Sequence, residues 1–329
     1  MRTGITILTI AVVGILSGCN GAANKDKVYM AVKFNESEPL KYSFEASREV
    51  DLNWDPSKKP AAGGKAKAST KFIEKMTMTV TYTPVEIDPY GLTVIEAKCG
   101  KVKIEKSQTN LPLDAADKFS DKTFRLSIGP TGKPVDYVSL NQLVWSVAEK
   151  SFRNDPTEGR VKDPEMTGDF IATQWFLWDS VASVKDPLQG VKPQDTWSSV
   201  LSVPLPMLGL KARNATYTLK EIQQGPAGQV AVISSEYSPG ENSACYWPLP
   251  YSGSFMVSGT FGFMLKFITN YDLVELAGQG EERFNIDLGR SEGYEQAYTA
   301  KLRAETAGPF GAKPEINIVQ KFSMKLLDK

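Results

Sequence analysis

The sequence predicts a mainly β protein of the α+β class, with long antiparallel curved sheets in two similar β-units and a helical insert between them. Three observations predict this class. Apolar and polar residues alternate over long runs, a central stretch changes to helical spacing, and a short motif recurs in both halves. With 329 residues, the chain is long enough for one large domain or two modest ones.

The first β-unit opens with alternation across residues 40–54, where the even positions are apolar except Arg48. A second alternating run follows at residues 72–82. Residues 92–104 are typical of a strand pair, or of one strand interrupted at Gly100, where a bulge would let Leu92 and Val94 share a face with Val102 and Ile104. Residues 124–137 predict a hairpin around the turn at residues 129–132.

Residues 138–195 lose the two-residue period. Ser139 can cap a helix, and the apolar residues that follow it recur at a spacing near 3.6: Leu140, Leu143, Val144, Val147 and Phe152. A second helical stretch carries aromatic residues between positions 170 and 178. We expect both helices to pack on the sheet.

An internal echo supports the second β-unit. Residues 216–222 (TYTLKEI) repeat residues 81–87 (TYTPVEI) with five identities in seven. A chance likeness of two strands is the alternative, since strands favour Thr, Tyr and Ile in any case. Alternating runs return at residues 255–267, 284–288 and 316–326, and their length favours large, curved sheets over a small barrel.

The composition excludes several classes of function. The chain has no histidine, which removes Ser-His-Asp and Cys-His catalysis and His-ligated zinc. Lys and Arg total 38 and Asp and Glu total 38, so bulk charge does not favour nucleic acid as a partner. The sequence contains no phosphate loop. Its one G-x-S-x-G string, at residues 289–293 (GRSEG), has no histidine with which to form a catalytic triad. We expect no cofactor, no metal and no enzyme activity, although a pair of carboxylates remains a possible catalytic device.

The N-terminus carries the most specific pattern. Arg2 precedes an apolar run that ends shortly before Cys19, and this run is too short for a spanning helix. Leu16-Ser17-Gly18-Cys19 resembles the lipobox of bacterial lipoproteins. The resemblance implies a signal peptide cleaved before Cys19, acyl chains on Cys19 such as palmitate, and attachment to the membrane through them. Asn20 in the next position implies transport to the outer membrane of the cell envelope, with the periplasmic or surface face left open.

Two other sets of residues are candidate sites. Cys99 and Cys245 are an even pair in an oxidising compartment, so a disulfide is compatible with the sequence, as are two free thiols. The second set is an apolar stripe typical of a ligand wall or of an ordinary core; it comprises Phe255, Val257, Phe261, Phe263, Leu265 and Phe267.

The body of the chain resembles an uncharacterised family of predicted envelope lipoproteins. The resemblance is carried by residues 190–197 (GVKPQDTW) and by the strand and glycine turn at residues 124–135. It implies no activity. The expected organisation is a signal peptide (1–18), a lipidated N-terminus with a short tether and first strand (19–37), a first β-unit (38–137), a helical insert and linker (138–195) and a second β-unit (196–329).

Three functions follow as hypotheses. The leading one is a membrane-anchored, noncatalytic structural or binding module that contacts an envelope protein. The second is a carrier or sensor of an apolar ligand such as lipid, which would use the stripe from Phe255 to Phe267. The third is a hydrolase of envelope polymer that uses two carboxylates.

Overall fold

The computed structural model describes residues 27–36, 38–53, 70–107, 115–152, 165–199, 203–204, 212–240, 268–306 and 313–327. The strands are β1 (Leu40–Asn53), β2 (Thr70–Ile87), β3 (Thr93–Cys99), β4 (Lys103–Lys106), β5 (Thr123–Ile128), β6 (Pro134–Asp136), β7 (Thr196–Ser198), β8 (Val203–Pro204), β9 (Ala212–Gly225), β10 (Gly228–Pro239), β11 (Ile268–Asn285), β12 (Arg290–Thr306) and β13 (Glu315–Leu326). The helices are η1 (Ala115–Phe119), α1 (Val138–Phe152), α2 (Glu165–Phe176) and α3 (Asp179–Ala182).

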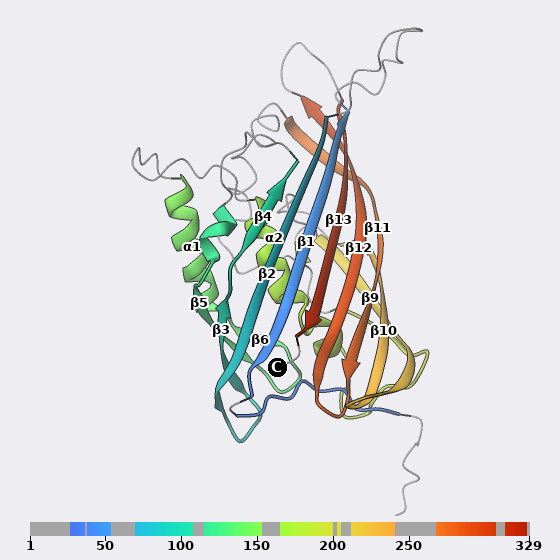
Figure 1. Ribbon diagram of the computed structural model, residues 1–329. Coiled ribbons are helices and arrows are strands. Elements are labelled where there is room, and N and C mark those ends of the chain that lie inside the picture. The colour runs from blue at the N-terminus through green and yellow to red at the C-terminus, as the bar shows by residue number, and fades with distance from the viewer. Residues whose placement is uncertain are drawn as a thin grey trace, which may run out of the picture.

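These strands form one large antiparallel sheet, curved and not closed on itself (Figure 1). The strand order is β6-β5-β3-β2-β1-β13-β12-β11-β10-β9-β7, with β4 beside β2 and β8 beside β9. The predicted fold class is confirmed. Both β-units belong to the same sheet because β1 pairs with β13, which places Phe44 between Met78 and Met324.

The core lies on the inner side of the curve. Along β1 every second residue is buried, as the two-residue period predicts, and the helices cover this same face, with α1 on β5 and α2 on β1. Aromatic rings fill the space between them. Trp178 meets Tyr82 with ring centroids 5.8 Å apart, and Phe119 stacks on Phe170 at 4.2 Å. The predicted helical insert is therefore part of the core.

The sequence echo corresponds to two strands with the same local irregularity. Residues 81–87 lie in β2 and residues 216–222 lie in β9. The pairing of β2 with β3 skips Val85, and the pairing of β9 with β10 skips Lys220, which is the equivalent position in the echo. A β-bulge bends its strand, so the repeated sequence places a bend at the same point of each β-unit.

Two expectations about local structure need correction, and a third is confirmed. The strand at residues 92–104 is interrupted at Gly100, whose N–H donates to the carbonyl of Thr79 at 2.7 Å. The inner face of β3 carries Thr93, Ile95, Ala97 and Cys99, so the expected face with Leu92 and Val94 is wrong. The side chain of Asp136, and not that of Ser139, accepts a hydrogen bond from the first N–H of α1.

Candidate functional site

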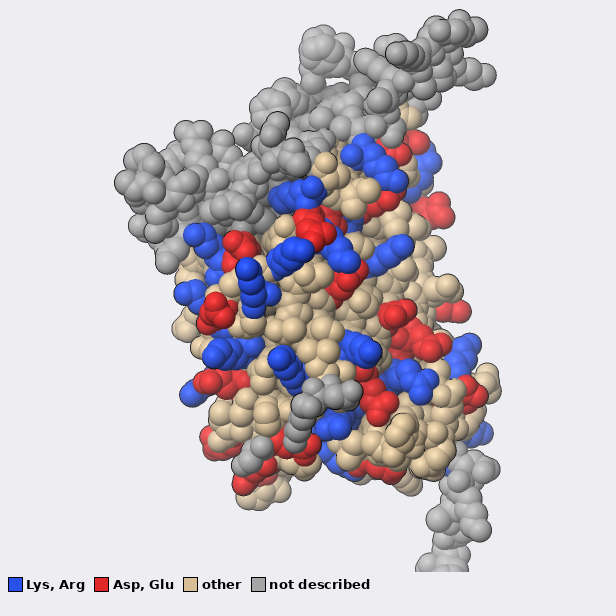
Figure 2. Space-filling model, in the orientation of Figure 1, with Lys and Arg blue, Asp and Glu red and all other residues tan. Residues whose placement is uncertain are grey.

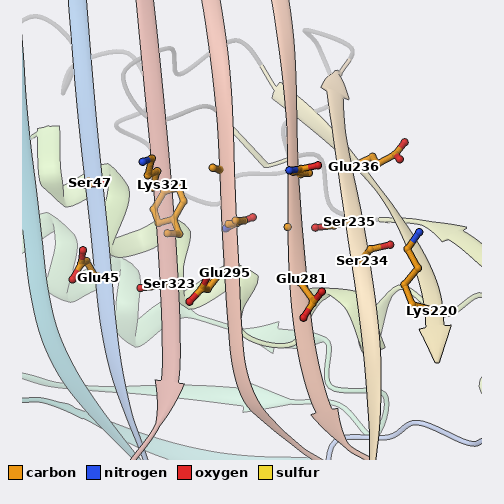
Figure 3. A pocket seen from close by; sticks show the side chains of 15 residues that line it. Glu45, Ser47, Lys220, Ser234, Ser235, Glu236, Glu281, Glu295, Lys321 and Ser323 are labelled. Atoms are coloured by element: carbon orange, nitrogen blue, oxygen red, sulfur yellow. The ribbon is translucent and has the colours of Figure 1, made fainter. Parts of the chain in front are cut away.

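The outer face of the sheet carries a groove. It has a volume of about 720 Å³ and crosses strands from β1 to β9 (Figure 3). A second hollow of about 450 Å³ shares Glu45, Glu295 and Ser323 with it. Because outward residues alternate with buried ones, the groove is lined by small and charged side chains: Glu45, Ser47, Lys220, Ser234, Glu236, Gln279, Glu281, Glu295, Lys321 and Ser323.

Two glutamates of the groove occupy opposite positions on neighbouring strands. Glu281 on β11 lies directly opposite Glu295 on β12, and both side chains are exposed. Facing residues of an antiparallel pair have Cβ atoms about 4.5–5.5 Å apart, and like charges there are destabilising. Within the part of the chain that the structure describes, no Lys or Arg forms an ion pair with either carboxylate.

Other carboxylates of the outer face, including Glu45 in the groove, meet opposite charges across strands. Lys75 on β2 pairs with Glu45 on β1 at 2.8 Å, and Lys301 on β12 pairs with Glu315 on β13 at 3.3 Å. Figure 2 shows the same mixture of blue and red over the visible face. The like-charged pair of Glu281 and Glu295 therefore differs from the opposite-charge pairs on the rest of this face.

On the inner face, a charged cluster joins the first β-unit to α2. The guanidinium of Arg48 lies 2.7 Å from Glu74 Oε2 and 3.2 Å from Asp169 Oδ2, and Lys106 Nζ lies 3.3 Å from Glu74 Oε1. Burial would raise the pKa of Glu74, but the charges of Arg48 and Lys106 lower it below its usual value. Burial raises the pKa of Asp169 to about 7, against the attraction of Arg48. We call these four residues the charged brace.

A second cluster joins the other β-unit to the helical insert. Asp179 on α3 accepts hydrogen bonds from Tyr217 at 2.6 Å and from Ser199 at 2.8 Å. Glu282 on β11 accepts hydrogen bonds from Ser180 at 2.5 Å and from Ser291. Burial raises the pKa of Asp179, and it raises the pKa of Glu282 to about 7. We call these residues the hydroxyl brace.

Several hydroxyl groups hold the two carboxylates of the hydroxyl brace. Both oxygens of Asp179 and both oxygens of Glu282 already accept hydrogen bonds from hydroxyl groups. These hydrogen bonds fix the helical insert to the sheet.

The two tyrosines of the sequence echo have the same role in the two β-units. Tyr82 on β2 donates to Gln174 on α2 at 2.5 Å, and Tyr217 on β9 donates to Asp179 on α3 at 2.6 Å. The repeated motif thus supplies one buried hydroxyl per β-unit to the insert.

Most residues of the sequence-predicted sites lie outside the described ranges. These are Cys19, Cys245, Phe255, Val257, Phe261, Phe263, Leu265 and Phe267. Cys99 is fully buried on β3 and has a free thiol in the described part of the chain, and burial raises its pKa to about 12. A disulfide with Cys245 stays a prediction.

The sequence contained one sign of the charged brace. Arg48 is the single charged residue in the apolar register of β1, and its side chain is 1% exposed. A charged residue at a buried position usually has a partner of opposite charge. The groove left no such sign, because Glu281 and Glu295 face each other only through the register of β11 and β12.

No protein-family model and no curated protein sequence matches the chain. Solved structures with some likeness include lipovitellin, studied for its lipid–protein interactions, at 11% identity and a TM-score of 0.46; the match covers 90% of this chain and 26% of that chain. The chain thus spans about a quarter of the lipovitellin chain. An outer membrane channel from Pseudomonas putida F1 has 8% identity and a TM-score of 0.20, with 91% of this chain and 98% of that chain covered. OpdL from Pseudomonas aeruginosa has 9% identity and a TM-score of 0.20, over 89% and 100% of the two chains. With TM-scores below 0.5, these likenesses carry no argument about function.

Two further observations concern membranes and metals. Of the helices described, none combines the length and the apolar character that crossing a bilayer requires. In the same ranges, acidic and cysteine side chains do not gather in threes as a metal ion would need.

Proposed function

We propose that this protein is a lipid-anchored, noncatalytic binding module of the bacterial cell envelope, and that it holds a positively charged, hydrogen-bonding partner in the groove on the outer face of its sheet. The anchor is the acylated Cys19 that the lipobox implies. Asn20 supports a place at the outer membrane.

The observation that carries the proposal is the facing pair of Glu281 and Glu295. A cation near both carboxylates offsets their repulsion, and the groove has room for a ligand larger than a single ion. The seryl hydroxyl groups and Gln279 supply both donors and acceptors for hydrogen bonds. Amino groups on a peptide or an aminated polymer fit this chemistry.

The two braces support the noncatalytic part of the proposal. The buried carboxylates of the described residues with raised pKa values are Asp169, Asp179 and Glu282, and each is bound to side chains that fix the insert. The carboxylates of the groove, in contrast, lie on an open surface, where they attract charge without a water-excluded site.

Binding of tetralysine amide, measured by isothermal titration calorimetry at low salt, tests the groove. We expect the double variant Glu281→Gln, Glu295→Gln to bind the peptide at least tenfold more weakly than the parent chain. The matched control is Glu96→Gln, Glu105→Gln, which removes the same charge outside the groove. Equal weakening in both variants would show that only net charge matters and would refute the groove.

The anchor has a separate test. Cys19→Ala should leave the chain unprocessed and without acyl chains, which metabolic labelling with palmitate and a gel shift would detect. An unchanged size and unchanged labelling would contradict the proposed anchor.

A further inference from the structure

One end of the molecule carries the most exposed apolar side chains of the described residues. These are Leu188, which is 88% exposed, Tyr90 at 87% and Tyr29 at 60%. Tyr90 lies in the turn after β2, and Leu188 lies in the turn at residues 185–190. Tyr29 belongs to the arm that crosses the same end, which is the lower end in Figure 1. We call this end the tether end, because the described chain begins there at Lys27.

The backbone holds these three side chains outward. Asp88 accepts hydrogen bonds from the N–H groups of Tyr90 and Leu92 at 2.8 and 2.7 Å, which fixes the tip of the β2–β3 turn. Val28 and Val191 exchange two backbone hydrogen bonds of 2.8 and 2.9 Å, so the arm with Tyr29 is tied beside the turn with Leu188. Exposed apolar residues on a fixed backbone form a preorganised binding surface.

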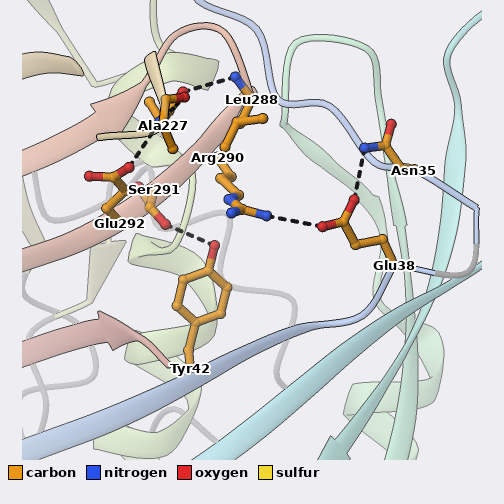
Figure 4. A network of polar contacts seen from close by, with 9 residues as sticks. Asn35, Glu38, Tyr42, Ala227, Leu288, Arg290, Ser291 and Glu292 are labelled. Atoms are coloured by element: carbon orange, nitrogen blue, oxygen red, sulfur yellow. Dashed lines mark hydrogen bonds and ion pairs between the residues drawn. The ribbon is translucent and has the colours of Figure 1, made fainter. Parts of the chain in front are cut away.

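A polar network also ties the arm to the β11–β12 turn (Figure 4). Glu38 accepts from Asn35 at 3.1 Å and pairs with Arg290 at 3.5 Å. Tyr42 donates to the carbonyl of Ser291 at 3.0 Å. Hydrogen bonds and an ion pair therefore join the N-terminal arm at the tether end to the second β-unit.

The length of the tether decides which end can meet a membrane. Cys19 precedes Lys27 by eight positions, and a fully extended chain of that length spans about 26–29 Å. The 14 residues of β1 span about 46 Å. A lipid anchor at Cys19 therefore keeps the tether end near the bilayer, and the opposite end, where β4 lies, cannot reach it in an upright molecule.

We infer that the tether end docks on the surface of the lipid bilayer, with Tyr29, Tyr90 and Leu188 entering the interfacial region. The inference rests on the proposed anchor at Cys19. Tyrosine favours this region because its ring is apolar and its hydroxyl is polar. Lysines and carboxylates both occur around these residues, including Lys185, Asp186 and Lys192, and this mixture matches the two charges of zwitterionic headgroups.

Site-specific fluorescence quenching tests the docking on the mature acylated chain. A bimane label is placed at Tyr90→Cys, at Leu188→Cys or at Lys103→Cys, which is on β4 at the opposite end. Each protein is inserted into vesicles of phosphatidylethanolamine and phosphatidylglycerol that contain nitroxide-bearing lipid, and the chain without an added cysteine sets the background. We expect at least about threefold stronger quenching at positions 90 and 188 than at position 103.

A second measurement tests the three side chains. With the label at Lys185→Cys, the triple variant Tyr29→Ser, Tyr90→Ser, Leu188→Ser should lose at least half of its quenching. The matched control Ile73→Ser, Val274→Ser, which removes exposed apolar residues elsewhere, should keep it. Equal quenching at positions 90, 188 and 103 in anchored protein would overturn the docking and leave the anchor intact. A chain that does not float with vesicles would refute both.

Discussion

The two β-units hold the same helical insert with different chemistry. In the first, the charged brace joins β1 and β2 to α2 through the guanidinium of Arg48. In the second, the hydroxyl brace joins β9, β11 and β12 to α3 through tyrosyl and seryl groups. The comparison teaches that a buried acid can be stabilised in two ways, by a cation or by hydroxyl donors, with different sensitivity to mutation and pH.

The largest effect should come from removing the cation of the charged brace. Arg48→Met leaves Glu74 and Asp169 buried with less positive charge beside them, and breaking a buried ion pair costs about 3–5 kcal/mol. Urea denaturation measures the loss in the free energy of unfolding. Arg125→Met removes an exposed pair with Glu96 and should cost less than about 1 kcal/mol. Equal losses would mean that the charged brace contributes little.

The hydroxyl brace should make stability depend on pH. Folding raises the pKa of Glu282 from 4.5 to about 7, so the folded state binds more protons between these values. The free energy of unfolding therefore falls as pH rises from about 4.5 to 7, by roughly 3 kcal/mol for this group. Glu282→Gln should remove this part of the decline in urea titrations at pH 5 and 7, while Asp169, which titrates in the same range, keeps its own part.

Glu281→Gln is the matched control for that experiment, because it changes the next residue along β11 on the outer face. It should leave the decline of stability between pH 5 and 7 as it is in the parent chain. The interpretation of Glu282 is wrong if both variants follow the curve of the parent chain.

The two equivalent tyrosines allow a sharper comparison. Tyr217→Phe removes a donor to the carboxylate of Asp179 and should cost about 1.5–3 kcal/mol when that acid is ionised. Tyr82→Phe removes a donor to the neutral amide of Gln174 and should cost about 0.5–1.5 kcal/mol. Urea denaturation at pH 8 measures both. Equal costs would show that a buried tyrosyl hydroxyl stabilises a carboxylate no more than it stabilises a neutral amide.

The smallest effect is expected outside both braces. Lys75→Met breaks the ion pair with Glu45 on the half-exposed outer face, and such pairs contribute about 0–1 kcal/mol. The melting temperature should shift by only a few degrees at most. A larger shift would mean that ion pairs on the outer face contribute substantially to the stability of the sheet.

The sequence predicts the fold where one face of a strand is plainly apolar. β1 and β13 follow the two-residue period, and the insert follows helical spacing. The stripe is harder to read in β12, whose buried face places Gln296 among tyrosines, alanines and a leucine: Tyr294, Tyr298, Ala300, Leu302 and Ala304. For β3 both faces carry apolar residues, so only its pairing with β2 decides which face is buried.

The sites were less predictable than the fold for a related reason. Arg48 stands out in its own strand, but its partner Asp169 lies on α2, far along the chain. Glu281 and Glu295 look like ordinary outward residues of two strands until the register places them opposite each other. Contacts of this kind depend on the complete sheet and not on any local pattern.

The pairing of β1 with β13 at the centre of the sheet also has a consequence for how the chain folds. Tyr42 lies beside Leu326, so β1 cannot complete its pairing until a strand far along the chain has been synthesised. Until then one edge of β1 is bare, and an unpaired edge with an apolar face invites association with other chains. Contacts this distant in sequence also slow folding. We therefore expect the growing polypeptide to be prone to association until β13 is available to pair with β1.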